Sequence, residues 1–380
     1  MIAFLCLFSC APKEAIPNTT QASEVSFDLD FFDANVNIGA GAACNDTTAL
    51  FKSRIGQILQ DSKGNHWIST QKEGVFLYDG QKLLPIGQEQ IDKQVRKIHE
   101  HTNGDIWLGI DSAVLIYDGR SLKRIELDKG KTLLTKSFSY TKENFDRQWT
   151  THLGEMRYSA FSQNGIYHFD GKRLRHLTLP VPQDYPAFDE KGYHPDQGWD
   201  RYAVYGIYQD RRQNIWFGTS GAGIFRFDGK EIICINEGRK KGVVRAIQED
   251  QEGKIWFGNN ANGINTYDGQ SVTNFSELRK VYTQGLQGAL DMIDDTEGNL
   301  WMATYDAGLW RYTPQADVMP KFPLSLDGKI LQQFTTKDGL NSNYVSVVHQ
   351  DHDGKIWVGT GYGGVYILDG ERFNPLSITN

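Results

Sequence analysis

The sequence predicts an all-β protein, and composition, alternating strand-like segments and an internal repeat support this prediction. Glycine accounts for 39 of 380 residues, about 10% against an average near 7%, while there are only 11 prolines. Excess glycine without excess proline indicates many tight turns rather than a disordered chain. Nine tryptophans, 17 tyrosines and 20 phenylalanines can fill a core between those turns. We therefore expect short strands joined by tight turns.

One motif recurs along most of the chain. The copy that starts at Val244 reads VRAIQEDQEGKIWFG, and GINTYDG follows it. Six clear copies lie near residues 55–80, 95–119, 204–229, 244–269, 290–313 and 345–370. A weaker copy, near residues 136–171, ends in NGIYHFDG and has Tyr158 where the others have tryptophan. Seven repeats of at least about 40 residues predict a β-propeller.

Each repeat reads as four strands. In the last copy, residues 345–350 alternate apolar and polar positions and lead into an Asp-x-x-Gly hairpin turn. Residues 355–359 form the expected second strand, residues 364–370 the third and residues 372–376 a weaker fourth. The predicted fold is therefore a seven-bladed β-propeller of four-stranded antiparallel blades.

The run IWxGT…GIxxFDG, with a lead-in such as DGLNSNYV at residues 338–345, resembles the two-component regulator propeller repeat. The resemblance covers nearly the whole chain from about residue 50. It departs from the pattern at Tyr158, at Gln213 and at Tyr312-Thr313. That repeat is known from periplasmic sensor regions of bacterial hybrid histidine kinases and from free-standing exported proteins. The resemblance implies a sensor-type propeller, and because we find no kinase domain we expect any phosphorelay to need a separate sensor kinase.

The N-terminus resembles a lipoprotein signal. Residues 1–9 are apolar, and Leu7-Phe8-Ser9-Cys10 resembles a lipobox, in which Cys10 would be lipidated. The stretch is shorter than the roughly 20 apolar residues that span a bilayer. We expect a signal peptide at 1–9, a tether at 10–23 and one propeller at 24–380, anchored by lipid in the bacterial envelope, on the periplasmic side or the outer-membrane surface. A chance apolar start is the alternative.

Charge and cysteine content exclude several classes of partner. The formal net charge of -7 gives no basic field to attract nucleic acid. Beyond the signal only Cys44 and Cys234 remain, and we favour two buried thiols over a disulfide. Without a CxxC or a histidine cluster we expect no metal site and no cofactor.

The repeated residues are interpreted as scaffold. A tryptophan at the same strand position in each repeat is best explained by packing between neighbouring sheets, with sugar stacking as the alternative. The repeated turn aspartates supply one carboxylate each, whereas calcium takes 6 to 8 oxygen ligands, so we assign them to turns. These aspartates are Asp61, Asp250, Asp295 and Asp351.

Candidate ligand-binding residues lie where the repeats differ. Loops between second and third strands share one face of a propeller with the connections between blades. The longest connection, residues 180–203, is rich in aromatic and charged residues, a composition that fits a glycan or peptide. Hydrophilic turns, or a loop folded onto its own aromatics, are the alternatives. The predicted ligand-binding residues are Tyr193, Trp199, Arg201, Tyr202, Asn260, Asn262, Tyr305, Asp306 and Tyr362.

The sequence favours a binding protein over an enzyme. No GxSxG, HExxH or phosphate-binding glycine loop is present. The favoured function is sensing or capture of a glycan or envelope protein. The alternative is a polysaccharide lyase or glycoside hydrolase, with Tyr193, His194 and Asp196 as weak acid/base candidates.

Overall fold

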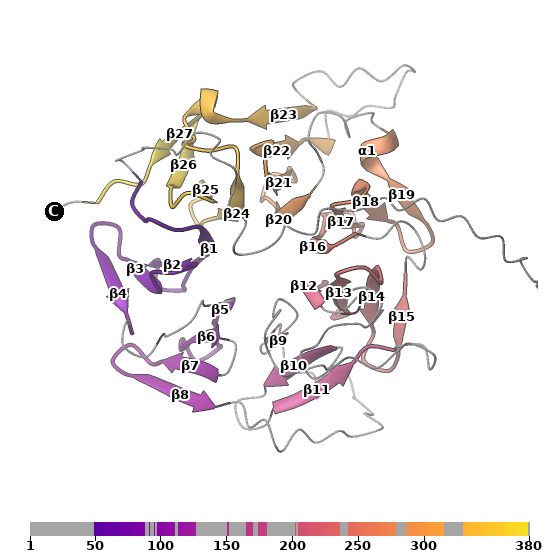
Figure 1. Ribbon diagram of the computed structural model, residues 1–380, viewed down its shortest axis with the longest axis horizontal. Helices are drawn as coiled ribbons and strands as arrows, with labels where there is room; N and C mark the ends of the chain where they lie inside the picture. The colour runs from indigo at the N-terminus through magenta and orange to yellow at the C-terminus, as the bar shows by residue number, and fades with distance from the viewer. Residues whose placement is uncertain are drawn as a thin grey trace, which may run out of the picture. The chain divides into compact units, whose positions relative to one another are not determined.

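Short β-strands make up nearly all of the secondary structure in this computed structural model (Figure 1). The structure describes residues 49–87, 91, 95, 97–110, 113–126, 150–151, 165–169, 174–180, 202, 204–235, 242–278, 286, 288–314 and 330–378. The lipoprotein signal, lipidation and tether predictions concern residues 1–23 and lie outside these ranges, as does Cys44. No helix within the described ranges has the length and apolar character needed to cross a membrane.

Six blades each contain four antiparallel strands in chain order. The first blade is β1 (Ile55–Gln60), β2 (His66–Thr70), β3 (Val75–Tyr78) and β4 (Leu83–Ile86). The second is β5 (Lys97–Glu100), β6 (Ile106–Ile110), β7 (Ala113–Tyr117) and β8 (Leu122–Glu126). The blade after the weak repeat is β12 (Val204–Gln209), β13 (Ile215–Thr219), β14 (Ile224–Phe227) and β15 (Ile232–Cys234).

Three further blades complete this set. The first of them is β16 (Val244–Glu249), β17 (Ile255–Asn259), β18 (Gly263–Tyr267) and β19 (Val272–Asn274), followed by the short helix α1 (Phe275–Leu278). The next is β20 (Ala289–Asp294), β21 (Leu300–Thr304), β22 (Leu309–Tyr312) and β23 (Leu331–Phe334). After the 3-10 turn Thr336–Asp338 comes the last, β24 (Val345–Gln350), β25 (Ile356–Thr360), β26 (Val365–Asp369) and β27 (Arg372–Pro375).

The prediction of seven four-stranded blades is wrong, because the described residues form six such blades. The described residues of the weak repeat form a sheet of three strands, β9 (Thr150–Thr151), β10 (Gly165–Phe169) and β11 (Leu174–Thr178). Its closing hairpin, β10–β11, keeps the alternating pattern of the other repeats and pairs in regular register. Upstream, the repeat has lost the Asp-x-x-Gly turn and the tryptophan segment that specify the first two strands elsewhere. The local residue pattern that marks the first two strands of the other repeats is therefore missing from this repeat.

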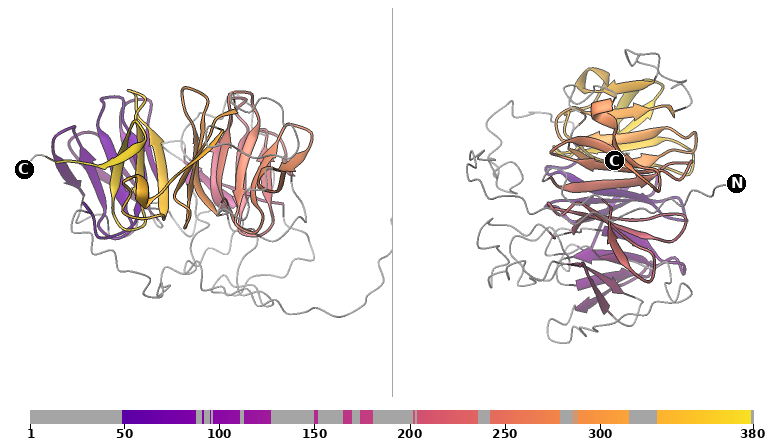
Figure 2. Two further views of the ribbon diagram at one scale, coloured as in Figure 1. Left: turned by 90° about the horizontal axis from the view of Figure 1, so that it is seen from above. Right: turned by 90° about the vertical axis from the view of Figure 1, so that its right-hand side faces the viewer.

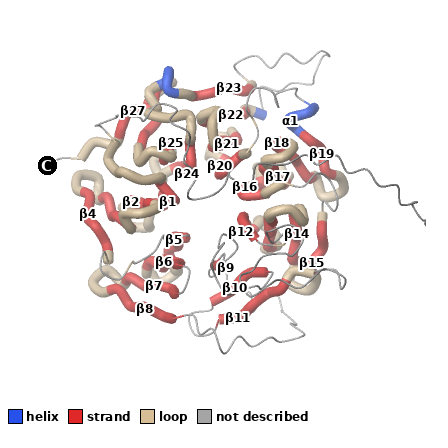
Figure 3. The backbone as a smooth tube through the Cα atoms, viewed as in Figure 1, coloured by secondary structure: helices blue, strands red, loops and turns tan. Residues whose placement is uncertain are grey.

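The blades are arranged radially, with the first strand of each nearest the centre (Figure 1). The innermost strands β12, β16, β20 and β24 lie side by side in that order, and β24 also lies against β1. The tube view shows almost no helix between the strands (Figure 3). Seen from the side, neighbouring strands within a blade run up and down, so the turns gather at two opposite faces (Figure 2). One face holds the hairpin turns between first and second strands, and the other holds the turns between second and third strands.

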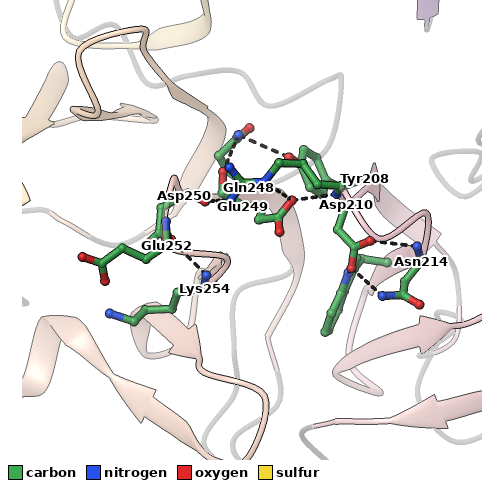
Figure 4. A network of polar contacts seen from close by, with 10 residues as sticks. Tyr208, Asp210, Asn214, Gln248, Glu249, Asp250, Glu252 and Lys254 are labelled. Carbon is green, nitrogen blue, oxygen red and sulfur yellow. Dashed lines mark hydrogen bonds and ion pairs between the residues drawn. The ribbon is translucent and has the colours of Figure 1, made fainter.

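Each repeated aspartate binds the repeated tryptophan six residues later. Asp210 accepts hydrogen bonds from the Asn214 backbone at 2.8 Å and from the indole Nε1 of Trp216 at 2.9 Å (Figure 4). The same indole–carboxylate bond, 2.7–2.9 Å long, recurs in four other blades at Trp67, Trp256, Trp301 and Trp357. These five tryptophans are 1–3% exposed. The aspartate thus closes the turn and also satisfies a buried donor, which supports the scaffold interpretation of both residues.

In four of the six described four-stranded blades, a glycine two residues after the tryptophan lets neighbouring blades pack closely. A Cβ on Gly359 would lie 2.5 Å from the Cβ of Ile55, and one on Gly218 would lie 2.9 Å from the Cβ of Val244. Each partner is the first residue of the next innermost strand. The repeated glycine is therefore required by packing between blades.

The last blade closes against the first without exchanging a strand. All four strands of the last blade come from residues 345–375. The Ser346 hydroxyl donates to the Ile55 carbonyl at 2.6 Å, and the Phe51 backbone N–H donates to the Gly363 carbonyl at 3.1 Å. One buried cluster joins Phe51 and Ile55 to Trp357 and other residues of the last blade. Closure therefore depends on side-by-side packing.

Candidate functional site

A cavity of about 370 Å³ lies among the innermost strands, and we call it the central channel. Its walls come from β1, β12, β16, β20 and β24, together with Val95 and Lys97 of the second repeat. The wall mixes apolar groups with side chains that can bind a polar ligand. Those polar residues are Arg54, Gln57, Lys97, Tyr205, Arg245, Asp291, Ser346 and His349.

A backbone irregularity that recurs in five blades places residues that differ between the repeats in this cavity. Five innermost strands shift register near their first residues, as between Ile55 and Gln57 in β1 and between Val204 and Gly206 in β12. Such a bulge re-aims the side chain at the irregularity. The residue directly after the first strand position is Gly56, Tyr205, Arg245, Leu290 or Ser346, and all five line the cavity. The bulge is common to the blades, while the side chain it presents differs in each.

Tyr205 and Arg245 form a cation–π pair across two neighbouring blades. The Arg245 guanidinium carbon lies 4.5 Å from the centre of the Tyr205 ring. Gly206 permits this approach, since a Cβ there would lie 2.3 Å from the Arg245 carbonyl oxygen. The pair places an aromatic face and a positive charge together in the cavity wall.

Two polar wall residues also join neighbouring blades. The Asp291 carboxylate accepts from the Val348 backbone N–H of β24 and from its neighbour Met292, both at 3.0 Å. The Gln57 amide accepts from the Ile98 N–H at 2.7 Å and donates to the Ile98 carbonyl at 3.2 Å. Burial raises the pKa of Asp291 to about 6, although these hydrogen bonds and the charge on Lys97 oppose the rise.

Lys97 differs from these residues in having no close partner. Its side chain is accessible to solvent inside the channel, although protein surrounds it. Loss of hydration lowers the pKa of Lys97, and the charge of Asp291 opposes the decrease. Within the described ranges, no residue accepts a hydrogen bond from the Lys97 ammonium or forms an ion pair with it. The ammonium is therefore available to a ligand.

Two histidines occupy equivalent positions further along the innermost strands. Burial lowers the pKa of His349 to about 4, and the nearby His66 adds to the decrease. Burial likewise lowers the pKa of His99 to about 4, with Lys97 adding to it. Both rings are therefore neutral at pH 7, and the cationic side chains that line the channel are arginines and a lysine.

Of the residues predicted from the sequence, Tyr193, His194, Asp196, Trp199 and Arg201 lie outside the described residues. Tyr202 is half-buried with its ring centre 6.3 Å from that of Phe225, in the apolar cluster of its blade. This packing gives Tyr202 a place in the scaffold.

Asn260 and Asn262 bind atoms of their own blade. The Asn260 side-chain oxygen accepts from the Val243 N–H at 2.7 Å. The Asn262 side-chain oxygen accepts from the Asn265 amide at 3.0 Å. These hydrogen bonds stabilise the conformation of the turn between β17 and β18.

Tyr305, Asp306 and Tyr362 come together on the face that holds the turns between second and third strands. The ring centres of Tyr305 and Tyr344 are 4.7 Å apart. Burial is the main cause that raises the pKa of Tyr305. The neighbouring side chains of Tyr344, Tyr362 and Asp306 add to the increase. The Tyr344 hydroxyl also accepts from Arg54 Nη1 at 3.2 Å, and Arg54 lines the cavity. The predicted loop residues are thus linked to the channel through a tyrosine and an arginine.

Sequence reasoning missed the channel residues. A usable signal was present, because the second and third positions of the first strands vary strongly between repeats. They are Gly56-Gln57, Tyr205-Gly206, Arg245-Ala246, Leu290-Asp291 and Ser346-Val347, and Lys97 stands at the corresponding place in the second repeat.

Three segments of the chain, residues 199–221, 238–261 and 339–362, match the model of the two component regulator propeller family. The chain carries two component regulator propeller repeats. This confirms the resemblance seen in the sequence. No curated protein sequence matches the chain.

Several solved structures share the propeller fold. An extracellular domain assigned to a hybrid two component system of B. thetaiotaomicron aligns with a TM-score of 0.55 and 20% identity, covering 84% of this chain and 38% of that one. A second structure from that organism, assigned to a one component system, aligns with a TM-score of 0.53 and 17% identity, covering 83% of this chain and 38% of that one. A streptogramin B lyase aligns with a TM-score of 0.56 and 13% identity, covering 86% of this chain and 96% of that one. At these identities the likeness shows the fold alone, and the chain spans well under half of the two B. thetaiotaomicron chains.

Proposed function

We propose that this chain is a sensor-type propeller of the bacterial cell envelope that binds a glycan or another envelope component in its central channel. The observation that carries the proposal is the cavity of about 370 Å³ whose wall includes Tyr205, Arg245 and Ser346, each presented by a bulge that recurs in five blades. A volume in this range suits a small ligand. The family of the repeats and the extracellular origin of the two B. thetaiotaomicron domains support a sensing role.

The proposal extends to the parts of the chain outside the described residues. Lipidation of Cys10 would hold the propeller at a membrane, and a separate kinase would receive the signal. Trp199 and Arg201 would add loop contacts to those of Tyr305 and Tyr362. Metabolic labelling with a fatty acid tests the anchor, since Cys10→Ala would abolish incorporation.

Ligand binding is tested by calorimetry and a glycan array with the purified protein. Tyr205→Ala removes an aromatic wall of the cavity, so we expect a loss of affinity of about tenfold or more. Tyr267→Ala is the matched control, because Tyr267 lies in the third strand of its blade and its hydroxyl donates to the Gly269 carbonyl at 2.8 Å. Failure of every glycan and envelope fraction to bind would overturn the proposed function.

A further inference from the structure

The channel wall carries more positive than negative charge. Among the described residues that line it, the cationic side chains are Arg54, Lys97 and Arg245, and the carboxylate is Asp291. His349, the remaining wall residue that could gain a positive charge, is neutral at pH 7. This surplus contrasts with the chain as a whole, which has a formal net charge of -7. The local field therefore favours an anion.

The carboxylate of Asp291, the one found among the described wall residues, is already engaged by the protein. Both oxygens of Asp291 accept backbone N–H groups, one of them from the neighbouring blade. No ion pair within 4.0 Å joins it to Lys97 among the described residues. Asp291 therefore acts mainly as a link between blades and leaves the Lys97 ammonium without close neutralisation.

The two arginines are held in place at the wall. Arg54 donates to the Tyr344 hydroxyl, and the Arg245 guanidinium lies over the Tyr205 ring. A positioned guanidinium is well suited to bind carboxylate, phosphate or sulfate oxygens. Tyr205 adds an aromatic face, and the hydroxyl- and amide-bearing side chains Ser346 and Gln57 lie in the same wall. Together these groups match a small polar ring that carries an anionic group.

We propose that the channel binds an acidic sugar of mono- to disaccharide size and that Lys97 and Arg245 receive its anionic group. This inference rests on the proposed function, because it assumes that the channel is the ligand site. Its new element is the charge of the ligand and the residues that select it.

Calorimetry at neutral pH tests the charge selectivity. The probes are glucuronate and glucose 6-phosphate as the carboxylate and phosphate forms of an acidic sugar, with glucose as the neutral match. We expect at least one acidic form to bind about tenfold or more tightly than glucose, and to weaken as salt is raised. The two acidic probes distinguish a carboxylate site from a phosphate site.

Variants of the wall test the assigned residues. Lys97→Met keeps the length of the side chain and removes its charge, so we expect about a tenfold loss of affinity for the acidic sugar. Lys97→Arg should keep most of the affinity. Lys230→Met is the matched control, because Lys230 is exposed in the turn between β14 and β15, and it should stay within about twofold.

The outcomes separate this inference from the proposed function. Equal affinity for glucose and the acidic sugars, or unchanged affinity in a folded Lys97→Met variant, would overturn the acidic-sugar assignment. If Tyr205→Ala still weakened glucose binding, the proposed function would stand. If no sugar and no envelope fraction bound, both would fail. Far-UV circular dichroism of each variant checks that it is folded.

Discussion

Asp295 shows how one side chain can fix both a turn and a core residue. Its carboxylate accepts from the Glu297 and Asn299 backbone N–H groups at 3.0 and 2.7 Å, and from the buried indole of Trp301 at 2.7 Å. A tryptophan N–H in an apolar interior needs such an acceptor, because an unsatisfied donor carries its full desolvation penalty. The second repeat replaces the aspartate with His101, whose ring stacks on Trp107 at 4.7 Å.

We expect Asp295→Ala to lower the free energy of unfolding by about 2–3 kcal/mol, because it leaves the buried Trp301 donor without an acceptor and removes the side-chain hydrogen bonds to the turn. Urea denaturation measures the change. Asp268→Ala is the matched control, since Asp268 accepts two turn N–H groups at 2.8 Å but is exposed and binds no tryptophan. A loss at Asp268 as large as that at Asp295 would argue against the indole bond as the cause.

His349 makes the folding stability of the protein depend on pH. Its folded-state pKa of about 4 lies below the ordinary value of 6.5, so the unfolded chain binds the proton more tightly between these values. The stability contributed by neutral His349 is therefore present above about pH 6.5 and lost as pH falls toward about 4. Asp291 acts in the opposite direction, because its raised pKa of about 6 makes protonation favour the folded state.

We expect His349→Gln to reduce the acid sensitivity of the protein. Between neutral pH and about pH 5, the wild type should lose about 1–2 kcal/mol more unfolding free energy than the variant, after allowance for solvent in the channel. Chemical denaturation at both pH values measures the difference. His352→Gln, at an exposed turn position, serves as the control. Parallel pH profiles for wild type and His349→Gln would contradict the assignment.

At the scale of elements, the second strand is the packing unit of each blade. All five residues are buried in β2, β6, β13, β17, β21 and β25. The sequence pattern predicted this strand well, because tryptophan stands at a fixed position in all six and glycine follows two residues later in four of them. The bulge in the first strand was not predictable, since it arises from pairing with the second strand and leaves no special residue at the irregular position. That bulge is what brings Tyr205 and Arg245 into the channel.

Gly359→Ala should destabilise the protein by about 2–3 kcal/mol, because the new methyl would overlap Ile55 at the junction between the last and first blades. Ser69→Ala is the matched control at the same position of the first repeat, where a Cβ is already accommodated. Ser69 is fully buried and its hydroxyl has no hydrogen-bond partner in the structure, so its removal should be neutral or stabilising. Thermal unfolding compares the two, and equal losses would contradict the packing argument.

At the scale of the whole molecule, ring closure depends on the C-terminal segment. Phe373 in β27 is 2% exposed and packs 5.6 Å from Phe334, and Leu376 belongs to the buried cluster that joins the last blade to the first. The Tyr78 hydroxyl also donates to the Ser377 carbonyl at 3.3 Å. The fourth strand of the last repeat was predicted at residues 372–376, and the structure confirms it.

A chain that ends at residue 371 should therefore lose about 4 kcal/mol or more and fail to give a cooperative unfolding transition, because two buried apolar side chains and an outer strand are removed. A chain that begins at residue 49 is the comparison, since every described strand of the six blades lies after it. That chain should unfold within a few degrees of the full-length protein in calorimetry. A cooperative, native-like transition for the C-terminal truncation would refute this account of closure.

The sequence by itself determined the repeat, its turns, its buried tryptophans and most strand positions, because these depend on local residue patterns with a fixed spacing. Tertiary structure decided the rest. Whether a drifted repeat completes a blade depends on packing against neighbouring blades as well as on its own residue pattern, and the described residues form six four-stranded blades where seven were expected. The charge of the channel likewise depends on which variable positions of separate blades converge at one place. Lys97, Arg245 and Asp291 are far apart in the chain, and only ring formation brings them into one wall.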